Sequence, residues 1–134
     1  MLSPLAIEAV HHIAVTTTNA ARSATFYREV LGFQDLDRPG FSFGGAWLYH
    51  PGSDLQIHVI EHPAAREPEG GIDTRADHFA MVVADLDKAE AQLKEHGVAY
   101  HRQINAGGYL QIFFRDPDGH HIEVGVYPPT VLPS

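Results

Sequence analysis

The sequence repeats one pattern of residues in its two halves. His12 begins the apolar stretch His-Ile-Ala-Val, and His78 begins the matching stretch His-Phe-Ala-Met. Each stretch is followed by a helix-like segment and later by a strand that carries another residue able to bind metal, His58 in Gln-Ile-His-Val and Glu123 in His-Ile-Glu-Val. The paired positions lie 46 residues apart in the first half and 45 in the second. A fixed internal period indicates two copies of one supersecondary unit.

The order of expected elements is the same in both halves. Alternating apolar residues predict strands at 10–16, 33–37, 43–50, 55–61, 78–84, 99–103, 109–115 and 120–127. A helix is expected from Thr18 or Asn19 to Gly32, and another from Asp85 to Gly97, because these residue types cap and end helices. A single copy would leave one face of its sheet uncovered. We therefore predict an α+β fold in which two tandem βαβββ modules form a cup-shaped mixed sheet.

The 134 residues are expected to form one domain. Module one is placed at about 8–62 and module two at about 77–127. Between them, 63–76 is rich in Pro, Gly and charge and is expected to be a linker, and 128–134 is expected to be an irregular tail.

Composition limits the partners and the chemistry. The net charge of −8 argues against nucleic acid and anionic membranes, which attract basic surfaces. The chain has no cysteine, so any metal site must use nitrogen and oxygen ligands. No apolar stretch reaches the roughly 18 residues of a membrane span, and the N-terminus lacks the pattern of a signal peptide. We expect a cytoplasmic protein with a small-molecule substrate.

The candidate ligands share one side of the predicted sheet. Side chains alternate along a strand, so Ile13 and Val15 face the helix while His12 faces away. The same reasoning directs His58, His78 and Glu123 away from the helices. Polar residues are common on a half-exposed sheet, but that does not explain His or Glu at four positions related by the repeat. If the sheet curls, the four side chains form a site for Zn, Ni, Fe, Mn or Co.

Several motifs resemble the vicinal oxygen chelate superfamily, which holds glyoxalase I, methylmalonyl-CoA epimerase, extradiol dioxygenases, fosfomycin-resistance transferases and bleomycin-binding proteins. The similarity covers residues 10–127. The motifs are His-His-Ile-Ala-Val at 11–15, Phe-Tyr-Arg-Glu-Val-Leu-Gly-Phe at 26–33, Asp-His-Phe-Ala at 77–80 and Asp-Pro-Asp-Gly-His-His-Ile-Glu at 116–123.

The resemblance implies paired βαβββ modules around one divalent metal, in a homodimer whose sites often draw ligands from both subunits. His12, His78 and Glu123 match the three ligand positions that the metal-dependent members share. His58 matches the fourth ligand position of glyoxalase I. Whether the site lies within one chain or between two stays open.

Departures from the family patterns help to choose among the reactions that the superfamily catalyses. Extradiol dioxygenases carry a catalytic Tyr ten residues before the Glu ligand, where this chain has Phe113. Fosfomycin-resistance enzymes have a hydroxyl residue where this chain has Ala14. Glyoxalase I holds glutathione through an Arg and an Asn at the positions of Thr16 and His62, so the thiol partner stays open.

We therefore predict a metal-dependent lyase or isomerase of the glyoxalase type (lactoylglutathione lyase) for a substrate with adjacent oxygens. Glu123 is the candidate proton shuttle, because it is the only carboxylate in the ligand set; a purely ligating Glu123 is the alternative. The rival functions are a non-haem Fe(II) dioxygenase and a metal-free drug-binding resistance protein. The residues expected to contact substrate are Trp47, Tyr109, Gln111, Phe113 and, for a substrate carboxylate, Arg38. Trp47 as ordinary core and Arg38 as a surface residue are the simpler alternatives.

Overall fold

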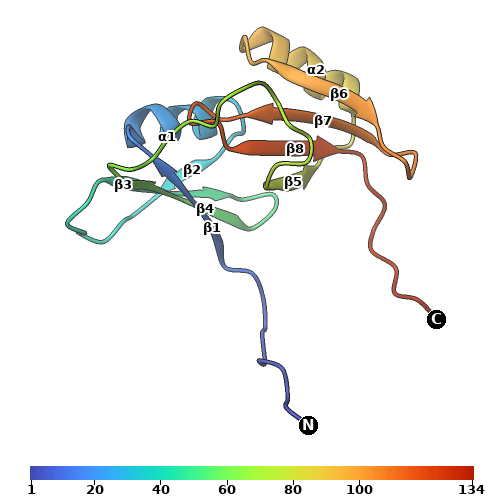
Figure 1. The fold of residues 1–134 in the computed structure, drawn as a ribbon, viewed down its shortest axis with the longest axis horizontal. Coiled ribbons are helices and arrows are strands. Elements are labelled where there is room, and N and C mark those ends of the chain that lie inside the picture. The colour runs from blue at the N-terminus through green and yellow to red at the C-terminus, as the bar shows by residue number, and fades with distance from the viewer.

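Each half of the chain folds into a four-stranded sheet with one helix on one of its faces (Figure 1). The computed structural model describes residues 1–134. Module one contains β1 (His12–Thr17), α1 (Ala20–Glu29), β2 (Gln34–Leu36), β3 (Gly45–His50) and β4 (Leu55–Glu61). Module two contains β5 (His78–Val82), α2 (Leu86–Glu95), β6 (Tyr100–Ile104), β7 (Leu110–Arg115) and β8 (His121–Gly125). The α+β class and the tandem βαβββ order are confirmed.

The predicted mixed sheet is divided into two sheets, with strand orders β1-β4-β3-β2 and β5-β8-β7-β6. In each sheet the first and last strands of the module pair in parallel, and the remaining pairs are antiparallel. Ala14 is paired with His58, and Ala80 with Glu123. The internal repeat therefore places a small residue beside a candidate ligand at equivalent points of both sheets.

Both helices begin and end as their sequences predict. The side chains of Asn19 and Asp85 accept hydrogen bonds from the backbone N–H groups of Arg22 and Lys88. These bonds satisfy donors that the first turn of a helix leaves free. Gly32 and Gly97 follow the helices with φ of 77° and 69°, a conformation that costs glycine little.

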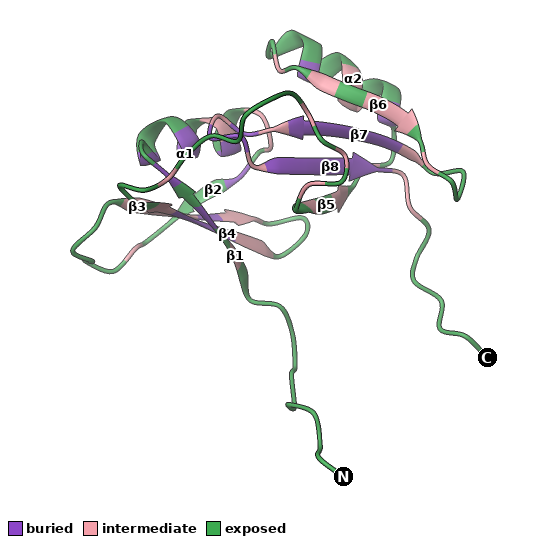
Figure 2. Cartoon of the chain, in the orientation of Figure 1, coloured by how far each residue is buried: buried purple, intermediate pink, exposed green.

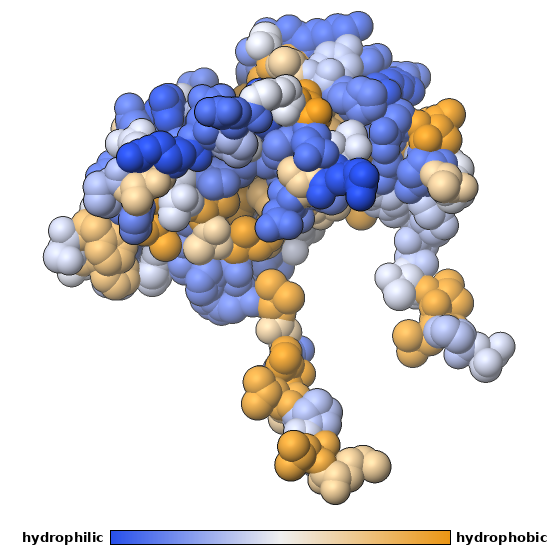
Figure 3. All heavy atoms as spheres, in the orientation of Figure 1, coloured by the Kyte–Doolittle hydropathy of each residue, from blue (hydrophilic) through white to orange (hydrophobic).

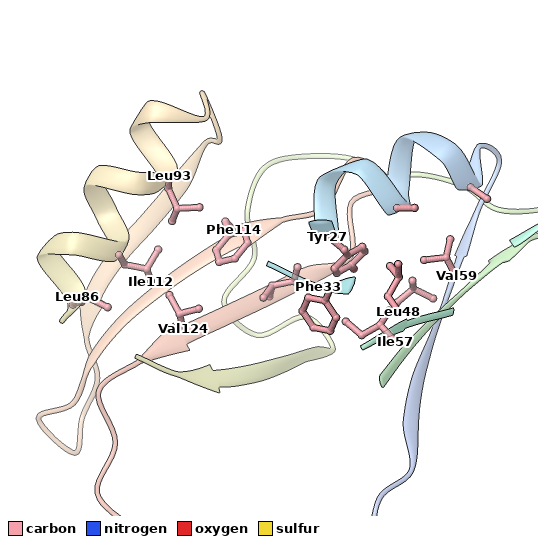
Figure 4. Packing of buried hydrophobic residues seen from close by; sticks show 14 residues of the cluster. Tyr27, Phe33, Leu48, Ile57, Val59, Leu86, Leu93, Ile112, Phe114 and Val124 are labelled. Atoms are coloured by element: carbon pink, nitrogen blue, oxygen red, sulfur yellow. The ribbon is translucent and has the colours of Figure 1, made fainter. Parts of the chain in front are cut away.

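The hydrophobic core lies between the helices and the sheets of both modules (Figure 4). Its largest fully buried members are Tyr27, Phe114, Leu48, Ile57, Ile112 and Ile122. The inward strand positions that the alternation predicts, such as Val15 and Val59, are buried as well. Figure 2 shows the buried stretches of β7 and β8 beneath the exposed outer surface of α2. The opposite faces of the sheets carry the candidate ligands, of which His58 and Glu123 are themselves buried.

A buried carboxylate joins the two modules. Asp118 lies in the turn between β7 and β8, and its Oδ1 accepts hydrogen bonds from the Thr17 hydroxyl at 2.8 Å and the Arg22 guanidinium at 2.7 Å. The Ser23 hydroxyl donates to the other carboxylate oxygen. These three donors belong to module one, so the turn of module two is fixed against the start of α1.

The two ends of the chain leave the body on the same side (Figure 1). Residues 1–11 and 126–134 form neither helix nor strand, and Figure 3 shows apolar side chains along both segments. Neither helix has the length and apolarity that crossing a membrane requires.

Candidate metal centre

The structure places the four predicted ligands in two pairs, one on each sheet. The rings of His12 and His58 are stacked, with centroids 3.9 Å apart. Nε2 of His78 lies 3.3 Å from Oε1 of Glu123. No group of three or more His, Asp or Glu side chains within the chain is placed so that it could hold a metal ion, so one chain does not gather all four predicted ligands. We name the pair His12 and His58 half-site one, and the pair His78 and Glu123 half-site two.

In half-site one, neighbouring groups fix the ring of His58. Trp47, its cross-strand partner on β3, stacks on the other face of the ring with centroids 4.4 Å apart. Nε2 of His58 lies 3.0 Å from the amide oxygen of Gln56, which only accepts, so Nε2 carries the proton and Nδ1 keeps its lone pair. Burial and then the nearby His12 and His11 lower the pKa of His58. His58 is therefore held in the neutral form that binds metal.

His12 also has a defined orientation. Its Nδ1 lies 2.8 Å from Nδ1 of His11, so the contact occupies one ring nitrogen and leaves Nε2 available. The sequence suggested no role for His11. The structure makes it the outer neighbour of the stacked imidazoles, at 6.3 Å from His58 between ring centroids.

Half-site two has the geometry of an incomplete metal site. Nδ1 of His78 donates to the carbonyl oxygen of Ala76 at 2.7 Å, which leaves the lone pair on Nε2. That lone pair faces a carboxylate oxygen of Glu123. Two electron-rich atoms in this arrangement require a proton or a cation between them. A bound divalent ion satisfies both atoms, so these residues fit a metal.

Glu123 has a neighbour that the sequence did not suggest. Its side chain is 9% exposed, and its Oε2 accepts a hydrogen bond from the hydroxyl of Tyr127. Burial, together with the hydrogen bond to Glu123, raises the pKa of Tyr127 to about 12, so the phenol stays protonated. In an extended segment, side chains two residues apart point to the same side, so positions 123, 125 and 127 share a face. That periodicity was the signal in the sequence that could have identified Tyr127.

The predicted substrate contacts divide between the two half-sites. The guanidinium of Arg38 lies over Phe41 at 4.8 Å from the ring centroid, and the Phe41 ring lies 6.0 Å from that of Trp47 between centroids. Beside half-site two, Phe113 is 2% exposed and meets the His78 ring edge-on at 5.3 Å. Gln111 is buried and donates to the Tyr127 hydroxyl at 2.9 Å, and Tyr109 packs against Tyr127.

The fold of two sheets agrees with the comparison of the sequence with known families. The pattern of the Glyoxalase/Bleomycin resistance protein/Dioxygenase superfamily matches residues 9–124. The chain belongs to this superfamily. The vicinal oxygen chelate resemblance is thereby confirmed.

Relatives within this superfamily carry different activities. Glyoxylase I 4 of Arabidopsis thaliana is 30% identical over 91% of this chain and 72% of its own length. Glutathione transferase FosA of Serratia marcescens is 27% identical over 90% of this chain and 82% of its own. Catechol-2,3-dioxygenase of Bacillus subtilis is 32% identical, but the match covers 86% of this chain and 40% of that protein.

Solved structures share the fold. The glyoxalase family protein from Enterococcus faecalis superposes with a TM-score of 0.76 at 22% identity, over 90% of this chain and 99% of that one. TnmS3, an antibiotic binding protein from Streptomyces sp. CB03234, superposes with a TM-score of 0.72 at 23% identity, over 93% of this chain and all of that one. The superfamily fold therefore serves both catalysis and binding, and the reaction must be argued from the site.

Proposed function

We propose that this protein is a divalent-metal-dependent lyase or isomerase of the glyoxalase type, whose metal site is completed between two copies of the chain. The observation that carries the proposal is the separation of the four ligands into two incomplete pairs on different sheets. Half-site one of one copy would face half-site two of the other. A twofold symmetric dimer then contains two equivalent sites.

The donor set suits the proposed chemistry. Three neutral imidazoles and one carboxylate leave a net charge of +1 around a divalent ion, which would polarise a substrate carbonyl and stabilise the negative charge that develops beside it. When its oxygen is released from the metal, Glu123 would take the proton from the hydroxyl-bearing carbon next to that carbonyl and return it to the carbonyl carbon, while the proton of that hydroxyl passes to the former carbonyl oxygen. The substrate is isomerised without net oxidation or reduction. The 30% sequence identity between this chain and glyoxylase I 4 of Arabidopsis thaliana supports this reaction type.

The surroundings of half-site one suggest the character of the substrate. Arg38 donates to the carbonyl oxygen of Phe43 at 2.9 Å and keeps further N–H groups that can meet an anionic oxygen. Trp47, which is partly exposed, supplies an apolar wall beside His58. We infer a small anionic or carbonyl substrate with two adjacent oxygens. Thr16 and His62 occupy the positions at which glyoxalase I has the Arg and Asn that hold glutathione. They therefore do not favour glutathione as the thiol.

A non-haem Fe(II) dioxygenase is the second candidate. Phe113 lacks the hydroxyl of the dioxygenase Tyr, but the structure brings the phenol of Tyr127 to the same carboxylate. His12, His78 and Glu123 would form the three-ligand iron site of this alternative.

Metal analysis and a substrate comparison test the proposal. Protein purified without chelators is expected to contain about one divalent metal per chain and to isomerise adducts of methylglyoxal with small thiols. Removal of the metal should abolish turnover, and re-addition should restore it. Metal-free, inactive protein would instead support a drug-binding function. Oxygen consumption with Fe(II) and catechol, without turnover of the adducts, would favour the dioxygenase.

A further inference from the structure

The geometry points to Tyr127 as a positioning residue that holds one oxygen of Glu123 and so presents the other to the metal, an inference that rests on the proposed metal site. Oε2 of Glu123 accepts the Tyr127 hydroxyl, while Oε1 faces Nε2 of His78. The two oxygens therefore have different partners. Glu123 is set to bind through a single oxygen.

A chain of amides determines which way the Tyr127 hydroxyl points. Nε2 of Gln111 donates to the Tyr127 oxygen at 2.9 Å, and Nε2 of Gln103 donates to Oε1 of Gln111 at 2.9 Å. Nε2 of His101 lies 3.2 Å from Oε1 of Gln103. A carboxylate only accepts hydrogen bonds, so the Tyr127 hydroxyl must donate to Glu123. The Tyr127 oxygen then accepts from Gln111, and Gln111 in turn accepts from Gln103. The single proton of the Tyr127 hydroxyl is thus directed at Oε2.

The register of the sheet builds this chain into the fold. Gln103 pairs with Gln111 across β6 and β7, and Gln111 pairs with Gly125 across β7 and β8. Gly125 lies between Glu123 and Tyr127 in the sequence. A Cβ at Gly125 would overlap the outer ring atoms and the hydroxyl of Tyr127. The absence of a side chain at this position is what lets the phenol lie back over β8 and reach the carboxylate.

Two substitutions test separately the presence of the Tyr127 hydroxyl and its position. Tyr127→Phe removes the hydrogen bond and keeps the ring. Gly125→Ala keeps the phenol but displaces it, at small expense to the fold because the ring is the movable end of a side chain. Tyr100→Phe is the matched control, since it also removes one tyrosine hydroxyl, but Tyr100 pairs with Phe114 of β7 and packs against the hydrophobic core, on the face of the sheet opposite Glu123.

Titration of the metal-free protein with Co²⁺ tests the inference. Tyr127→Phe and Gly125→Ala are each expected to weaken Co²⁺ binding by about 10-fold, the range seen when a group supporting a metal ligand is removed. Both should change the visible Co²⁺ spectrum in the same way. Tyr100→Phe should match the wild type in affinity and spectrum, and the melting temperatures of the metal-free variants should stay close to that of the wild type.

The outcomes distinguish this inference from the proposed function. If the wild type binds Co²⁺ stoichiometrically and both variants show its affinity and spectrum, Tyr127 does not position Glu123, and the metal site stands without it. A wild type that binds no Co²⁺ would overturn both. A loss in Tyr127→Phe alone would show that the displaced phenol still reaches Glu123, which contradicts the role assigned to Gly125.

Discussion

Glu123→Gln is expected to lower Zn²⁺ affinity by about 100-fold or more and turnover at saturating metal by about 10²–10⁴-fold. The substitution keeps the shape of the side chain but removes the only negative charge of the predicted ligand set, and with it the candidate proton acceptor. Half-site two would then present an amide to His78 in place of a carboxylate oxygen. Calorimetric titration of the metal-free protein measures the first effect, and initial rates at saturating metal measure the second.

The control for this experiment is Glu95→Gln, at the exposed end of α2. It removes the same charge from the protein and should change neither quantity. Wild-type Zn²⁺ affinity in Glu123→Gln would show that Glu123 is not a ligand. Weak binding with full turnover once metal is saturating would instead assign Glu123 to the metal alone and place the proton transfer elsewhere.

Asp118→Ala is expected to lower the free energy of unfolding by about 3 kcal/mol, because it removes the acceptor of buried hydroxyl donors and of a guanidinium. Thr17 and Ser23 are fully buried, so water cannot replace the lost carboxylate without opening the contact between the modules. Arg22, which is partly exposed, can turn to solvent. Urea denaturation followed by circular dichroism measures the change.

Asp87→Ala provides the matched comparison for Asp118. The Asp87 carboxylate pairs with Arg102 at 2.8 Å but is 86% exposed, so its loss should change the free energy of unfolding by less than about 1 kcal/mol. Equal effects of the two substitutions would show that the Asp118 contact does not hold the modules together.

Much of the fold followed from two regularities of the sequence. The repeat fixed the number of modules, and the alternation of apolar residues in segments such as 55–61 identified which strand faces are buried. Strand ends were less accurate. The last strand ends at Gly125, two residues before the predicted end, because ladder pairing with β7 stops at Gln111. Apolar patterning extends beyond the backbone pairing that defines a strand.

The same alternation predicted that the four candidate ligands face away from the helices, but it did not predict that they lie in two pairs on separate sheets. Parallel pairing brings His58 to His12 and Glu123 to His78, and both pairs follow from local register. How two modules sit against each other depends on buried contacts such as Thr17 with Asp118, 101 positions apart, which no local pattern encodes. For this reason the sequence could not show that a single chain leaves the two pairs separate.

Hybrid dimers test the central claim most directly. One chain would carry His12→Ala and His58→Ala, and a differently tagged chain would carry His78→Ala and Glu123→Ala. Neither chain alone should bind Zn²⁺ tightly. The purified heterodimer unites the intact half-site one of the second chain with the intact half-site two of the first, so we predict one Zn²⁺ per dimer with the affinity of the wild type. A heterodimer without tightly bound Zn²⁺ would contradict a site shared between two copies.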